Sequence, residues 1–117
     1  MGILDLLGIS KISKVKTELR KKNLIPQADL LQQIKDAGYP DNWNEKRRDL
    51  EIGMLVVKKV NIMAAANSLS RFTDTRDICF KNGLEDAGKY FQNYVDLYEY
   101  YITTTLPSQA KQKSNQK

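Results

Sequence analysis

The sequence predicts an all-α fold, an antiparallel bundle of four helices in one domain. A chain of 117 residues is the usual size of a single domain. Apolar residues recur three and four positions apart in several segments, as they do on one face of a helix. Glycine and proline separate these segments at positions typical of helix ends. We expect residues 1–106 to form the domain.

The first helix is expected at about 9–22. Its apolar residues follow one another at intervals of three, three and four, which places them on one helical face. They are Ile9, Ile12, Val15 and Leu19.

The second helix is expected at about 26–37, because its ends are clearly marked. Pro26 suits the first turn of a helix, where no backbone donor is needed. Gly38 suits the position just after a helix, and Pro40 prevents the helix from continuing.

The third helix is expected at about 44–71 and should be the central one. Its middle part, IGMLVVKKVNIMAAA, is apolar at eleven of fifteen positions. On a helical projection these residues surround the whole axis, and a helix that is apolar all round is enclosed by other helices. We therefore expect Val57 to be buried in one core with Phe91.

The fourth helix is expected at about 75–103, joined to the third by a turn at FTDTR. Apolar positions step alternately by four and three along it, which is typical of a helix that packs on another at a shallow angle. The segment KNG at 81–83 is also a helix-stop signal, so this helix could begin afresh there. The last residues, 107–117, consist of one proline, one alanine and otherwise polar residues, so we expect a disordered basic tail.

Most tyrosines of the chain lie in the stretch YFQNYVDLYEYY. Helical projection places nearly all of them on the packed side, and three of them at one border of it. Tyrosine rings bury apolar area while their hydroxyls reach water or a partner, and they are enriched at binding hot spots. We therefore predict a partner interface at Tyr90, Tyr94 and Tyr101, with at least two of these rings exposed.

The composition argues against an enzyme. The chain has no histidine, which removes the commonest general base and the commonest transition-metal ligand. Its single cysteine, Cys79, therefore has no histidine to activate it. Phosphate-binding loops and paired cysteine motifs are absent. We predict no catalytic residue, no cofactor, no metal and no small-molecule substrate.

The leading functional interpretation is a non-enzymatic protein-interaction module, such as a small adaptor, inhibitor or assembly factor. Its partner would be another protein or a second copy of the chain, bound through the tyrosine-rich helix. The lone cysteine favours a reducing, cytoplasmic setting. The sequence does not favour a membrane surface, because no apolar run approaches the length of a membrane span.

The alternative is a basic accessory or regulatory protein that binds nucleic acid. The formal net charge is +5, and basic residues cluster at 11–22 and 44–48. Segment 26–51 has the pattern of helix, turn and helix, with basic residues at the start of the second helix, where a helix-turn-helix places its recognition residues. The candidate contacts are Lys46, Arg47, Arg48, Arg20, Lys21 and Lys22.

Overall fold

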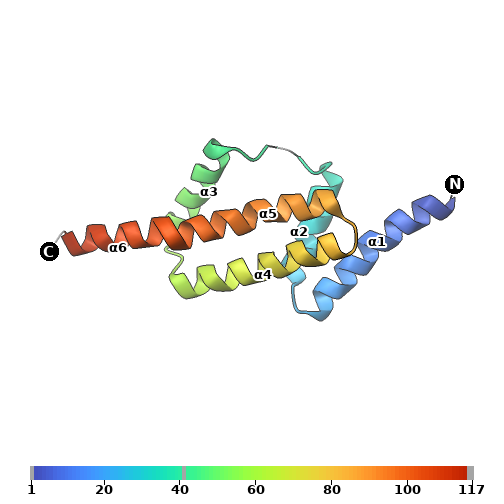
Figure 1. Cartoon of the computed structure of the whole chain (residues 1–117), viewed down its shortest axis with the longest axis horizontal. Helices are drawn as coiled ribbons and strands as arrows, with labels where there is room; N and C mark the ends of the chain where they lie inside the picture. The colour runs from blue at the N-terminus through green and yellow to red at the C-terminus, as the bar shows by residue number, and fades with distance from the viewer. Residues whose placement is uncertain (1, 41, 116–117) are drawn as a thin grey trace.

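The computed structural model describes residues 2–40 and 42–115, and every regular element within these ranges is helical (Figure 1). The predicted all-α class is therefore confirmed. In chain order the elements are α1 (Gly2–Lys21), α2 (Ile25–Asp36), α3 (Glu45–Val57), α4 (Ile62–Lys81), α5 (Glu85–Tyr100), the π-helical turn η1 (Tyr101–Thr105) and α6 (Leu106–Asn115).

The centre of the fold is an antiparallel hairpin of α4 and α5 (Figure 1). The chain reverses after Asn82, where Gly83 takes the left-handed conformation, with φ of 79°. Beside this turn the Phe80 ring covers Gly88 so closely that a Cβ there would lie 2.5 Å from Cε1 of Phe80. The stop signal at Asn82 and Gly83 therefore ends a helix. The predicted turn at FTDTR is wrong, because those residues lie inside α4.

Aromatic rings fill the space between α4 and α5. Phe91 is fully buried, and its ring centroid lies 6.1 Å from that of Phe72. Phe72 also stacks on Tyr94 at 4.7 Å and on Tyr98 at 5.7 Å. The apolar residues spaced alternately by four and three in the predicted fourth helix are thus the residues through which α5 packs on α4. Phe72 supplies its partner surface although it belongs to the segment that was expected to turn.

The first two helices close the core from one side of the hairpin. The predicted apolar face of α1 is buried at Ile12, Val15 and Leu19, and α2 buries Leu31 and Ile34. The second helix is confirmed within one residue at each end, whereas the first begins at Gly2 rather than near residue 9.

Polar contacts also join α1, α2 and the turn between them to α4. The Lys81 ammonium donates to Glu18 Oε2 at 2.8 Å. The Arg71 guanidinium donates to the carbonyl of Asn23, in the turn between α1 and α2, at 2.8 Å.

The prediction of one central helix at 44–71 is wrong, because the helix ends at Val57 and a new one begins at Ile62. Lys59 takes a left-handed conformation with φ of 56°, and the Asn61 side chain then caps α4 by accepting from the amide of Ala64 at 2.9 Å. Asparagine is among the best N-cap residues, so it begins a new helix here. The apolar residues that surround one axis on a projection are in fact divided between two helices.

The position of α3 also differs from the expectation. α3 contains no buried residue, and Val57 is 81% exposed instead of sharing the core with Phe91. The helix contacts α5 toward the end of the hairpin away from its turn, whereas α1 and α2 lie nearer the turn (Figure 1). The predicted bundle of four helices with the third at its centre is corrected accordingly: α4 and α5 are central.

The disordered tail expected from Pro107 is not confirmed, because α6 continues the line of α5 as far as Asn115. The wide turn η1 stands directly before it, and the amide of Leu106 reaches back to the carbonyl of Tyr101. Proline removes a helical hydrogen bond and its ring crowds the carbonyl four residues earlier, so a widened turn just before Pro107 relieves that conflict. Residues 116–117 lie outside the described ranges.

The burial of Phe91 gives a first prediction. Phe91→Ala should lower the free energy of unfolding by about 3–5 kcal/mol, since it removes buried area and leaves a cavity. Tyr100→Ala should cost much less, because Tyr100 is 37% exposed and its ring contacts the Arg48 guanidinium at the surface. Urea unfolding of the two variants followed by circular dichroism makes the comparison, and equal losses would contradict the packing described here.

Candidate interaction surface

One side of α3 is firmly attached to the rest of the protein. The helix begins at Asn44, whose side chain accepts from the amide of Arg47 at 2.8 Å. The guanidinium of Arg47 lies 4.7 Å from the Trp43 ring centroid, and that of Arg48 lies 4.6 Å from the Tyr100 ring centroid. These stacked cations and the half-buried aliphatic residues of α3 turn toward the hairpin.

Trp43 connects α3 to the core. Its ring packs edge-on against Tyr94 at 5.1 Å and against Tyr90 at 6.2 Å, as expected for a residue that folds over the apolar interior. Its indole nitrogen is buried without a hydrogen-bond partner among the described residues. The contacts of the Trp43 ring with Tyr90 and Tyr94 are apolar, so the N-terminal end of α3 is held by packing.

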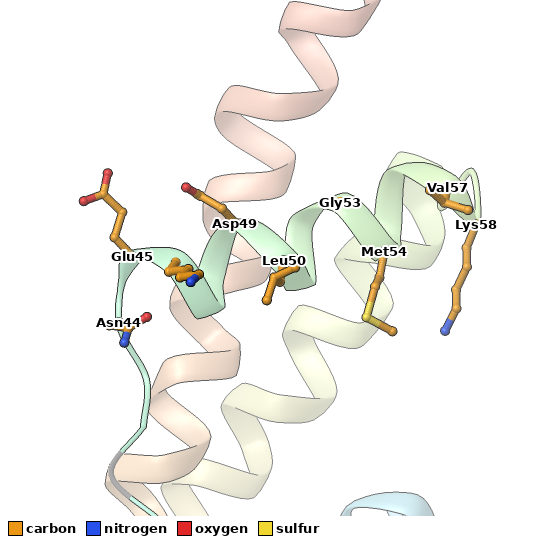
Figure 2. Close-up of a pocket in the computed structure, with 9 residues that line it drawn as sticks. Asn44, Glu45, Asp49, Leu50, Gly53, Met54, Val57 and Lys58 are labelled. Carbon is orange, nitrogen blue, oxygen red and sulfur yellow. The ribbon is translucent and has the colours of Figure 1, made fainter.

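The other side of α3 is an exposed apolar surface, which we call the α3 face. Leu50 is 64% exposed, Met54 51% and Val57 81%. At 100° per residue these three and Gly53 fall within one arc of the helix, which is the arc opposite the attached side. Figure 2 shows the side chains of Leu50 and Met54 projecting to the same side of the helix. The groove over this face is lined by Asn44, Glu45, Lys46, Asp49, Leu50, Gly53, Met54, Val57 and Lys58.

Gly53 has no structural role in the isolated chain. A Cβ built on it meets nothing within 4 Å, and its backbone is helical with no positive φ. Glycine in a helix interior costs about 1 kcal/mol relative to alanine, so its presence here is unfavourable for α3 alone. It contrasts with Gly88, where the Phe80 ring occupies the space of a side chain.

Charged residues stand at both ends of the α3 face. The carboxylates of Glu45 and Asp49 lie near its N-terminal end and both contact the Arg48 guanidinium, at 3.8 and 3.1 Å. Lys46 lies at the same end and Lys58 at the other. Within the described residues neither lysine takes part in an ion pair. In Figure 2 the two carboxylates point away from the side that carries Leu50 and Met54.

The predicted tyrosine border is largely inside the protein. Tyr90 is only 8% exposed and Tyr101 1%, while Tyr94 is half-buried between Phe72 and Trp43. The Tyr101 hydroxyl donates to the carbonyl of Val60, in the segment between α3 and α4, instead of reaching solvent. The expectation that at least two of the three rings are exposed is therefore wrong. These tyrosines hold α5 to α3 and α4.

The six candidate nucleic-acid contacts are not gathered on one surface. Figure 1 shows α3 on one side of the hairpin and the C-terminal end of α1, with Arg20 and Lys21, on the other. Arg47 pairs with Glu51 at 3.6 Å, besides its contact with Trp43, and Arg20 pairs with Asp29 at 3.8 Å. Lys46, Lys21 and Lys22 are exposed.

Two structural absences and the state of Cys79 bear on the chemistry of the described residues. No group of three or more metal-binding side chains occurs there. No helix within it has the length and hydropathy needed to cross a membrane. Cys79 is fully buried, and this burial raises the pKa of its thiol to about 12, which leaves it protonated and unreactive near neutral pH.

Helical periodicity did not reveal the α3 face. A signal was present in the sequence at Asn61, a strong N-cap residue in the middle of an apolar run. A helix end predicted there would have placed Leu50, Met54 and Val57 on a short separate helix. A single neighbouring helix covers only one side of such a helix and leaves the other side exposed.

Comparison with protein-family models, with curated proteins and with solved structures gave no significant match.

The buried thiol and phenols predict a loss of stability at alkaline pH. Burial raises the pKa of Cys79 and also the pKa values of Tyr98 and Tyr101 above their ordinary values. In the unfolded chain these groups ionise first, so the unfolded state binds fewer protons and stability falls as pH rises from about 9. The free energy of unfolding in urea, measured between about pH 7.5 and 11, should decrease throughout the upper half of this range.

Cys79→Ala provides the control for this titration. It removes the thiol contribution, so the decline should begin nearer pH 10, where the phenols of the unfolded chain ionise. A free energy of unfolding that stays constant or increases above pH 9 would show that these groups are not buried in solution.

Proposed function

We propose that the protein is a non-enzymatic interaction module that binds a protein partner through the α3 face. The observation that carries this proposal is the exposure of Leu50, Met54 and Val57 along one side of a helix whose other side is attached. Contiguous exposed apolar side chains with a polar border are typical of protein-binding sites. Scattered apolar residues would need no such explanation.

The free energy available at this face is sufficient for a weak to moderate interaction. Complete burial of a leucine, methionine or valine side chain is worth about 1.5–3 kcal/mol. The three side chains together therefore offer several kcal/mol, from which the cost of association must be subtracted. Gly53 would allow a partner backbone to approach closely in the middle of the face.

A small adaptor, inhibitor or assembly factor is the kind of protein that such a docking face would serve. The single buried cysteine supports a reducing, cytoplasmic setting for such a protein. The nucleic-acid alternative gains no support from the arginines of its second cluster, because Arg47 and Arg48 are engaged with aromatic rings and carboxylates of the same chain.

The proposal predicts site-specific capture. A photoreactive amino acid placed at Met54 should crosslink a protein in the native cell extract, because Met54 lies within the α3 face. The same group at Ile25, which is 47% exposed on α2, is the matched control and should capture nothing specific. The crosslinked protein, once purified, should bind the unmodified chain in a titration followed by calorimetry.

The double variant Leu50→Ser and Met54→Ser should weaken this binding at least tenfold, which corresponds to about 1.4 kcal/mol. Ile25→Ser should leave the affinity unchanged. Circular dichroism of both variants verifies that the helices are retained. Equal crosslinking at Met54 and Ile25, or unchanged affinity in the double variant, would exclude the α3 face as the binding site.

A further inference from the structure

We infer that the turn between α3 and α4 docks on membrane surfaces that contain anionic phospholipids. The inference goes beyond the proposed function, because it adds a second surface and a different kind of partner. Two observations carry it. The most exposed apolar side chains among the described residues gather at this turn, and the segments around it, 52–73 and 100–117, contain lysines and no acidic residue.

The apolar side chains at the turn are unusually exposed. Val57 and Met63 are each 81% exposed, the highest values among the large apolar residues that the structure describes, and Ile62 is 58% exposed. Val57 ends α3, and Ile62 and Met63 begin α4, so the short turn 58–61 joins all three. We call these three residues, with Lys58 and Lys59, the α3–α4 corner. Aliphatic side chains exposed in this way are suited to the boundary between lipid headgroups and acyl chains.

The charges of the α3–α4 corner complement an anionic surface. Lys58 and Lys59 lie between its apolar residues and are both exposed. Within the described part of the chain neither lysine takes part in an ion pair. The nearest acidic residues in the sequence are Glu51, which pairs with an arginine of its own helix, and Asp74, in the middle of α4. An anionic leaflet therefore meets cations at this corner and no carboxylate of the turn.

A second basic segment starts beside the corner. The Tyr101 hydroxyl, at the beginning of η1, donates to the carbonyl of Val60 within the turn. From η1 the chain continues directly into α6 (Figure 1), and residues 100–117 contain lysines but no acidic residue. The turn at the other end of the hairpin has mixed charge, because α4 ends in a lysine and α5 begins with Glu85 and Asp86. An anionic surface is therefore expected to attract the end that carries the α3–α4 corner.

The combination of lysines with exposed aliphatic side chains favours a lipid surface over a nucleic acid. Cationic and hydrogen-bonding groups bind a phosphate backbone, which gains nothing from valine, isoleucine or methionine. Single strands are bound through aromatic rings, and the corner contains none. At a bilayer surface the ammonium groups meet anionic headgroups while the aliphatic side chains enter the acyl boundary. Peripheral docking of this kind requires no apolar run long enough to span a bilayer.

Co-sedimentation of the full chain with vesicles tests the docking. Vesicles of phosphatidylcholine with about one-third phosphatidylserine should retain the protein at about 0.1 M salt. They should release most of it at about 1 M salt, where the Debye length falls from about 10 Å to about 3 Å. Vesicles of phosphatidylcholine alone should retain little. Equal retention by both kinds of vesicle, or retention by neither, overturns the inference.

Charge reversal locates the site on the chain. Lys58→Glu with Lys59→Glu should reduce partitioning onto the anionic vesicles at least about tenfold, since each lysine near such a surface contributes about fivefold. Lys11→Glu with Lys14→Glu changes the net charge equally at exposed positions of α1 and is the matched control. Partitioning of this control should fall much less. Equal losses would show that net charge governs the binding, which would overturn a docking site at the corner.

The contribution of the apolar side chains has its own test. Met63→Ser should reduce partitioning about threefold to tenfold, because it removes an apolar side chain that enters the acyl boundary. Ile25→Ser, at an exposed apolar position on α2, should leave partitioning unchanged. Circular dichroism verifies that both variants keep their helices. Equal partitioning of the two variants would contradict insertion of the corner.

An environment-sensitive fluorophore reports where the lipid lies. Attached at Met63→Cys, it should shift to shorter wavelength when anionic vesicles are added. The same label at Ile25→Cys should not shift, and the native Cys79 is buried and should stay unlabelled. A shift at Ile25→Cys as large as that at Met63→Cys would place the lipid elsewhere and overturn the inference.

Two further outcomes also overturn the inference, and they separate it from the proposed function. Retention on duplex or single-stranded DNA that Lys58→Glu with Lys59→Glu abolishes, without retention on vesicles, identifies a nucleic acid as the occupant of the corner. Vesicle binding that Leu50→Ser with Met54→Ser abolishes, while Met63→Ser has no effect, places the lipid on the α3 face and contradicts both proposals. If the protein binds no vesicle while Met54 still crosslinks a protein, only the membrane inference fails.

Discussion

The fold depends on the packing of α5 against α4. Phe91 is fully buried between them, and Gly88 allows the Phe80 ring to lie against the helix backbone where the hairpin turns. α1 and α2 pack on this pair of helices near its turn, and α3 contacts α5 farther from the turn. The core residues of α1 and α2 belong to one cluster with those of α4 and α5, so these four helices form the cooperative unit.

α3 stands outside that unit and is attached by aromatic contacts. Trp43 packs on Tyr90 and Tyr94 at one end, and the Tyr101 hydroxyl holds the carbonyl of Val60 at the other. The helical projection places Tyr90, Tyr94 and Tyr101 at the border of the packed face. In the structure these tyrosines attach α3 to the hairpin. Because Tyr90 and Tyr101 are buried, the exposed apolar side chains lie on α3 and not at these tyrosines of α5 and η1.

This attachment leaves α3 with two unequal sides. A helix enclosed by neighbours contributes its apolar residues to stability, whereas a helix with one neighbour exposes whatever apolar residues lie opposite. Leu50, Met54 and Val57 lie on the side of α3 opposite the attached side, and no part of the described chain buries them. Their exposure along one side of a single helix is the feature that connects the architecture of the fold to the proposed interaction.

The sequence by itself determined the helical class, the second helix within one residue at each end, the buried face of α1 and the packed seam of α5. These features depend on local signals, namely helix-end residues and a period near 3.6, which act within a few residues of the chain. The sequence also contained the stop at Asn82 and Gly83, although it did not show whether that signal or the one at FTDTR would make the turn.

Only the tertiary structure decided where the long apolar segment breaks and which of its residues are enclosed. Asn61 can cap a helix or lie within one; in the folded chain it caps α4, and the neighbouring carbonyl of Val60 accepts from the Tyr101 hydroxyl. Burial depends on which elements meet in space, and a projection of one helix contains no information about its neighbours. For that reason Val57 was expected in the core and is instead part of the exposed α3 face.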